Sequence, residues 1–335
     1  AAIVSLTPAS GFAGEEFDSA DHAVMLTPGE IDNSQSGLTI VHSAEQEGVT
    51  DWRTGFDQPA DNTLIFSLTA EGAQHLNLIG GDQIALIHGE IRSGADDTIL
   101  FAAPNGIYIG STAIIDVGSF VAVGADMTDI DSIGAGDLPL TSEIVTAPGS
   151  LIRAEENVLL YGTDILLAGE VYTPGGRLLA VGADSIHFLD VDTITEGLTN
   201  PMDLVALTGN GGVQNLGELT AESAALIGRR VVNTGHIEIE DGTLMMLGGD
   251  AVRLVEFGDP VVVEIPRANG PDNHVEAREY AVENRGTIDA GRGRVQRRDR
   301  QPVRGEHAVR HLHVVDENAE LHGPPLKRLA QTSGF

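Results

Sequence analysis

The chain has 335 residues and a formal net charge of −31, from 50 acidic residues against 19 lysines and arginines, and it has no cysteine. The negative charge disfavours binding to nucleic acid and electrostatic docking on anionic lipid, because phosphate groups repel an acidic surface. The lack of thiols excludes disulfides, zinc–thiolate sites, iron–sulfur ligation and a cysteine nucleophile.

The overall composition predicts a β-rich chain. There are 41 glycines while aromatic residues make up only 4%, a combination that favours many short strands joined by tight turns. No segment approaches the roughly 20 apolar residues that cross a bilayer as a helix. We therefore expect no transmembrane segment, and Ala1–Leu6 lacks the basic and long apolar regions of a signal peptide.

A tight corner is the first element that the sequence defines well. Pro104 pre-sets its own φ, and Asn105 and Gly106 tolerate positive φ. These residues separate two apolar runs, Ile99–Phe101 and Ile107–Ile109, which we expect to be strands.

The middle of the chain contains an internal repeat. Residues 158–188 align without a gap on residues 224–254, at an offset of 66, and four glycines and one aspartate coincide. The first copy predicts short strands separated by glycine-containing corners: Val158–Leu160, Ile165–Leu167, Glu170–Tyr172, Arg177–Val181 and Ser185–Phe188. The corners follow one another too closely for helical crossovers, which need about a dozen residues.

Repeats of this kind predict a parallel β-solenoid. Each strand would pair with its equivalent one coil away, about 4.8 Å distant, and inward apolar side chains would form ladders. Glycine at the corners lets the coil bend without a Cβ clash. An antiparallel β-sandwich also uses short strands and turns, but hairpin dipeptides are scarce in this sequence, which favours the solenoid.

A third copy of the repeat lies near the C-terminus. Val282–Val295 aligns with Val231–Leu244 at an offset of 51, and the apolar pattern then stops. Residues 1–266 hold 40 acidic and 7 basic residues, whereas residues 267–335 hold 10 and 12. We interpret residues 296–335 as an Arg- and His-rich tail that is disordered, unrelated to the repeat or out of frame.

Several segments resemble the two-partner secretion domain of filamentous-haemagglutinin-like exoproteins. Ala103–Ile107 resembles the Asn-Pro-Asn-Gly-Ile signature of that family, with Ala103 in place of the first Asn. Ser111–Asp131 looks like the continuation of the signature, and Val49–Pro59 is similar to the Trp and Phe segment followed by Gln-Pro. The motifs cover residues 35–135, although a second Asn-Pro motif of the family is not found upstream.

The resemblance implies an all-β fold, a right-handed parallel β-helix with an N-terminal cap and extra-helical loops. Residues 1–50 would form capping strands and residues 51–295 the β-helix secretion domain. It also implies a non-enzymatic secretion module of a large adhesin, exported to the surface of a Gram-negative bacterium or beyond. An outer-membrane barrel transporter would recognise it through POTRA domains, and host-cell or surface glycans are a further class of partner.

The resemblance assigns transporter recognition to one short segment: Ala103, Pro104, Asn105, Gly106 and Ile107. The alternative is that this corner only turns the coil. A chain without cysteine can also pass through a pore in the unfolded state, since no disulfide loop can form. Folding coil by coil outside the cell would favour export in one direction.

Carboxylate and histidine clusters are the remaining candidates for chemistry. A β-helical polysaccharide lyase or hydrolase, or a calcium-binding surface protein, would need carboxylates brought together. The acidic clusters lack the spacing of known calcium loops, so we read them as solvated faces, and we expect no catalytic residue, metal or cofactor. These candidates are Asp126, Asp129, Asp131, Asp190 and Asp192, together with His307, His311 and His313 in the tail.

Overall fold

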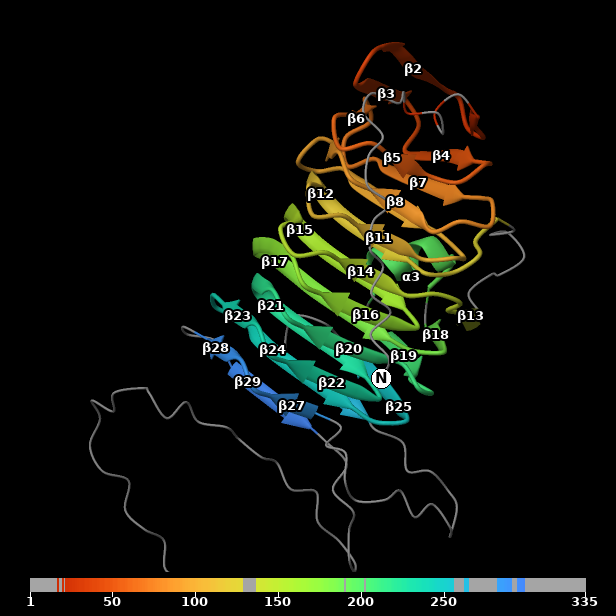
Figure 1. The fold of residues 1–335 in the computed structure, drawn as a ribbon. Helices are drawn as coiled ribbons and strands as arrows, with labels where there is room; N and C mark the ends of the chain where they lie inside the picture. The colour runs from red at the N-terminus through yellow and green to blue at the C-terminus, as the bar shows by residue number, and fades with distance from the viewer. Residues whose placement is uncertain are drawn as a thin grey trace, which may run out of the picture.

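The protein, described here from a computed structural model, winds into a parallel β-helix. The structure describes residues 17, 20, 22–128, 137–189, 191–201, 203–255, 262–264, 282–290 and 294–298. Successive coils stack along one axis (Figure 1), and equivalent strands pair in parallel from coil to coil. The predicted solenoid is therefore confirmed, and the antiparallel sandwich is wrong for this chain.

Each coil contributes a strand or half-strand to each of three faces, except the last described coil, which contributes to the first two. The first face contains β3 (Leu38–Ser43), β6 (Thr63–Leu68), β9 (Glu90–Arg92), β23 (His236–Ile239) and β28 (Thr287–Asp289). The second contains β4 (Glu47–Trp52), β7 (Gln74–Ile79), β10 (Thr98–Ala102), β24 (Thr243–Gly248) and β29 (Arg294–Arg298).

Four long strands bend at register shifts and run through both the first and second faces. They are β12 (Ile114–Val123), β15 (Leu151–Gly162), β17 (Glu170–Gly182) and β21 (Glu218–Gly228). Glu170–Tyr172 and Arg177–Val181, which the sequence predicts as two strands, are thus parts of the single strand β17. The bend occurs because the register shifts between Thr173 and Arg177, without breaking the ladder.

The third face is a separate sheet of eight short strands in parallel. It contains β5 (Asp57–Gln58), β8 (Ala85–Ile87), β11 (Ile107–Ile109), β14 (Ile144–Thr146), β16 (Asp164–Leu167), β20 (Gly212–Asn215), β22 (Arg230–Asn233) and β27 (Val282–Asn284).

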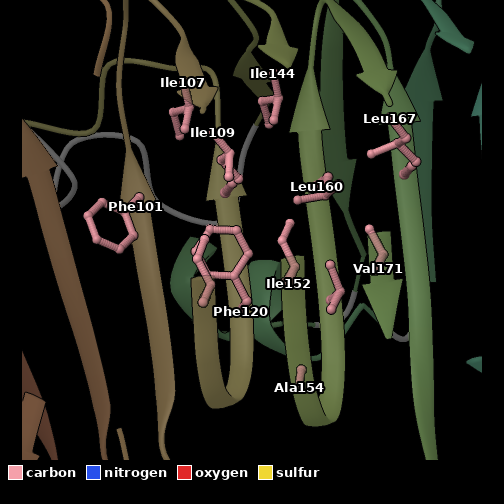
Figure 2. Close-up of a cluster of buried hydrophobic side chains, with 14 of the residues drawn as sticks. Phe101, Ile107, Ile109, Phe120, Ile144, Ile152, Ala154, Leu160, Leu167 and Val171 are labelled. Atoms are coloured by element: carbon pink, nitrogen blue, oxygen red, sulfur yellow. The ribbon is translucent and has the colours of Figure 1, made fainter. Parts of the chain in front are cut away.

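The interior of the coil is a continuous apolar core made of ladders. On the third face, Ala85, Ile107, Ile144 and Ile165 lie in one ladder, and all are buried in the same cluster as the inward residues of the other faces. Figure 2 shows aromatic rings such as Phe101 giving way along this core to Ile, Leu and Val.

The second face is buried on both sides from β7 to β24, which explains its uninterrupted apolar sequences from β10 onward. Its outward residues, such as Leu159 and Leu179, pack in a second core under an extra-helical antiparallel sheet and a short helix. That cover contains β13 (Asp137–Pro139), β18 (Ser185–Phe188), α3 (Ile194–Thr199), β19 (Asp203–Leu207), β25 (Ala251–Val255) and β26 (Val262–Glu264).

An N-terminal cap covers the first coil, in the way the resemblance implies. Strand β1 (Ala23–Met25) pairs antiparallel with β4, and β2 (Gly29–Gln35) pairs antiparallel with β3. Phe17 completes the cap from inside, because its ring lies 5.5 Å from that of Trp52 and 5.2 Å from that of Phe56.

The sequence repeat of 66 residues corresponds to two coils. Val158 pairs with Leu178, which pairs with Ala224, so the two aligned copies are separated by one whole coil. Ser185–Phe188 is a strand, as predicted, but it is β18 of the extra-helical sheet and pairs antiparallel with β19. Its counterpart in the second copy, β25, lies on the other side of β19.

The third copy forms the last described strands. Strands β27, β28 and β29 pair with β22, β23 and β24 at the predicted offset of 51. The backbone of β29 continues in register to Arg298, beyond Val295. The tail after residue 298 lies outside the described residues, and residue 50, the expected end of the capping strands, falls inside β4.

Candidate functional site

The segment Ala103–Ile107 forms the corner between the second and third faces. It connects β10 to β11, and Ala103, Gly106 and Ile107 are buried while Asn105 is exposed. Within the corner, the Gly106 amide donates to the Ala103 carbonyl (3.3 Å), which closes a four-residue turn. Gly106 has φ +109°, a conformation that favours glycine. The tight corner predicted from Pro104, Asn105 and Gly106 is confirmed.

The corner is fixed to the preceding coil by two hydrogen bonds. The Asn105 side-chain Nδ2 donates to the carbonyl of Gly81 (3.0 Å), and the Ala85 amide donates to the carbonyl of Gly106 (2.9 Å). Gly81 itself has φ +78° and lies at the equivalent corner one coil earlier. Gly81 could not be predicted from the sequence, because nothing in the spacing indicates that a residue 24 positions upstream lies beside Asn105.

The following coil holds the corner from its other side. The hydroxyl of Thr141 donates to the Pro104 carbonyl (2.8 Å), and the hydroxyl of Ser142 donates to the Ala103 carbonyl (3.0 Å). The Ile107 amide donates to the Glu143 carbonyl (3.1 Å). The corner therefore has a fixed shape, imposed by contacts to both neighbouring coils.

The five residues of the corner divide into structural and exposed groups. Ala103 and Ile107 belong to the interior core, where Ile107 pairs with Ala85 and Ile144. Pro104 is half-buried, and Asn105 presents its side chain to solvent. Any partner that binds this corner from outside will therefore contact chiefly Pro104 and Asn105.

The acidic candidates do not form a metal site in the part of the chain that the structure describes. No group of three or more His, Cys, Asp or Glu residues that could hold a metal ion occurs there. Asp126 accepts hydrogen bonds from the hydroxyl and amide of Thr128, and these bonds lower the pKa of its carboxyl. Asp192 is exposed. The other predicted candidates, Asp129, Asp131, Asp190, His307, His311 and His313, lie outside the described residues.

Helix content is also slight. None of the helices among the described residues has the length and hydropathy to span a membrane.

The comparisons with known proteins support the fold and leave the family open. No family model matches the sequence, and no curated protein matches it. Among solved structures, the fold is similar to the crystal structure of the HMW1 secretion domain from Haemophilus influenzae, with a TM-score of 0.55 and 18% sequence identity. The match covers 82% of this chain and 86% of that chain. At this identity the similarity shows a shared fold.

Proposed function

We propose that this chain is the secretion module of an exported exoprotein of the two-partner type, and that an outer-membrane transporter recognises it at the corner Ala103–Ile107. The observation that carries the proposal is the shared fold with a secretion domain over more than four-fifths of both chains. The sequence signature at residues 103–107 independently suggests the same kind of protein.

The geometry of the corner supports a role in recognition. A recognition element needs a side chain that is exposed and held in one conformation, because ordering it on binding costs free energy. Asn105 meets both conditions, since its amide is fixed by Gly81 while the residue remains exposed. Pro104 adds a rigid apolar surface next to it.

The architecture also suits export. Equivalent strands in successive coils pair directly, so that a coil can fold onto the one before it, and the cap encloses the first coil. A chain that leaves a pore N-terminus first could fold in this order.

Export of matched variants with and without the transporter tests the proposal. We expect wild-type chain to reach the medium only when the transporter is present, and Asn105→Ala to reduce export at least fivefold. Asn210→Ala is the matched control, because Asn210 is also exposed at a corner and its side chain also makes one hydrogen bond, in which Oδ1 accepts from Arg229 (3.2 Å). Wild-type export that does not depend on the transporter would contradict the whole proposal. Equal export of the two Asn variants would contradict the assignment to the corner.

A further inference from the structure

A row of outward apolar side chains runs along the third face, next to the Asn105 corner. Leu86, Tyr108, Val145 and Leu166 occupy one register position in four successive coils. Each lies between two buried neighbours on its strand and is itself half-buried. Successive coils are about 4.8 Å apart, so this third-face stripe extends roughly 14 Å along the helix.

The three faces differ in what their outer sides carry. The outward residues of the second face pack in the core beneath the extra-helical sheet. On the first face, the outward positions of four coils mix charges of both signs with apolar side chains. One row is Glu90, Ile114, Leu151 and Glu170, and the other is Arg92, Asp116, Arg153 and Tyr172. The third-face stripe has neither feature, and its four residues belong to neither of the two apolar cores.

Negative charge flanks the stripe on the corner side. Glu143 immediately precedes β14, and Asp164 is the first residue of β16. Both are exposed, as is Asp184 nearby. Partial desolvation raises the pKa of Asp164, the Gly212 amide that donates to it opposes this effect, and the negative charges of Glu143 and Asp184 add to the rise. Carboxylates that repel one another in this way favour a cationic partner.

We infer that the third-face stripe, and not the corner alone, is the docking surface for the transporter, whose periplasmic domain would present apolar side chains flanked by Lys or Arg. The inference rests on the proposed function and deepens it. The stripe adjoins Asn105, its tyrosine and aliphatic side chains are of the kind buried at the centre of interfaces, and the acidic flank supplies complementary charge.

Cysteine footprinting on the full chain tests the inference, because the chain has no cysteine of its own. Val145→Cys on the stripe is compared with Leu151→Cys, which lies six residues later, is also half-buried and points outward from the first face. The probe is the purified periplasmic domain of the transporter. We expect it to slow maleimide labelling at position 145 at least fivefold and to leave labelling at position 151 unchanged.

Charge substitutions give an independent measurement. We expect Val145→Asp to weaken binding of the periplasmic domain tenfold or more and Leu151→Asp to change it less than twofold. Equal effects at the two positions would overturn the inference. Two further outcomes would contradict the assignment of position 145 to a transporter-binding surface. Labelling that slows as the chain concentration rises, without the periplasmic domain, would indicate that a second copy covers the stripe. Labelling that becomes fast only after removal of residues 1–16 would indicate an intramolecular cover.

The two proposals fail in different ways. If wild-type chain neither binds the periplasmic domain nor depends on the transporter for export, the proposed function is wrong. If it does both and positions 145 and 151 behave alike, only the third-face assignment is wrong.

Discussion

The first coils and the later coils of this β-helix bury different kinds of side chain. In the first coils, the aromatic rings of Trp52, Phe66 and Phe101 share the interior with His75 and Asn77. In the later coils, the equivalent second-face ladders are aliphatic and run through residues such as Val158, Leu178 and Leu244. Both regions use the same backbone pairing, so the difference lies in what fixes one coil against the next.

Hydrogen bonds made by buried side chains fix the register of the first coils. Trp52 Nε1 donates to Asn77 Oδ1 (2.9 Å), and Asn77 Nδ2 donates to the Leu100 carbonyl in the next coil (3.1 Å). Only one alignment of the three strands makes both bonds, whereas aliphatic ladders also pack after a two-residue slip. The capped end therefore has the more specific interior, which suits the region where winding starts.

The largest expected effect comes from Trp52→Ala. It removes a fully buried ring from the aromatic cluster and leaves Asn77 without a donor. We expect a loss of about 3–5 kcal/mol in the free energy of unfolding. Leu178→Ala, in an aliphatic ladder, leaves no polar group unpaired, and so its loss should be smaller in the same denaturant titration. Equal losses would contradict the distinction between the two regions.

Acid should weaken the first coils through His75. Burial lowers the pKa of His75 to about 4, below its ordinary 6.5, so the unfolded chain binds the proton more tightly. The stabilisation is complete above pH 6.5 and is lost as the pH falls toward 4, by up to about 3 kcal/mol.

The measurement is the difference in unfolding free energy between wild type and His75→Gln across that pH window, which removes the contributions of the acidic residues. The ring of His75 contacts the Thr50 hydroxyl (2.9 Å) and lies against Phe66, and glutamine retains a hydrogen-bonding side chain there. A difference that does not vary with pH would show that His75 does not report on this interior.

Gly106→Ala should destabilise the corner by about 1–3 kcal/mol, because its positive φ disfavours a side chain. An added Cβ would also lie 3.0 Å from the Glu143 carbonyl oxygen. At Gly175 the nearest atom to an added Cβ is 3.8 Å away, so Gly175→Ala should change stability by only about 0.5 kcal/mol. Thermal unfolding of both variants measures the contrast.

Asn233→Ala tests whether a ladder of asparagines fixes the later coils, as His75 and Asn77 do in the first coils. Asn215 Nδ2 donates to Asn233 Oδ1 (2.8 Å), and Asn233 Nδ2 donates to Asn284 Oδ1 (2.7 Å). We expect a loss of about 1–2 kcal/mol in chemical denaturation. A neutral result would mean that apolar packing alone holds these three coils.

Asn105→Ala should have little effect on stability. Its hydrogen bond to Gly81 is exposed, and the loss should stay below about 1 kcal/mol. Unfolding curves measured beside the export assay then separate recognition from folding. An export defect that scales with lost stability would place Asn105 with the structural residues.

Turns and the pairing of repeated strands could be predicted from the sequence, whereas contacts between different faces and their covering elements could not. The turn at Pro104–Gly106 follows from residue chemistry within four positions, and the coil register at offsets of 66 and 51 follows from repeated glycines and Asn233. The sequence shows a single period of 66 where the structure has two coils, because an extra-helical excursion interrupts the second one.

The hydrophobic pattern of the sequence does not show which strands are covered on their outer side. His75 and Asn77 alternate with Leu76 and Leu78, and only the cover over the second face explains why all four are buried. The third-face stripe was missed for a similar reason: in Ala85–Ile87 every residue is apolar, so the sequence does not show which side faces outward.

The extra-helical sheet has a mechanical consequence. Strand β18 pairs with β13 on one side and β19 on the other, and β19 pairs with β25, so that the excursions that follow β12, β17 and β24 are joined edge to edge. Arg253 adds a paired contact to Asp203 (2.7 and 3.0 Å). A plain solenoid under tension would release its coils one at a time. Here one sheet joins the coils from β12 to β24, and we expect a chain under tension to release them together in a single long extension.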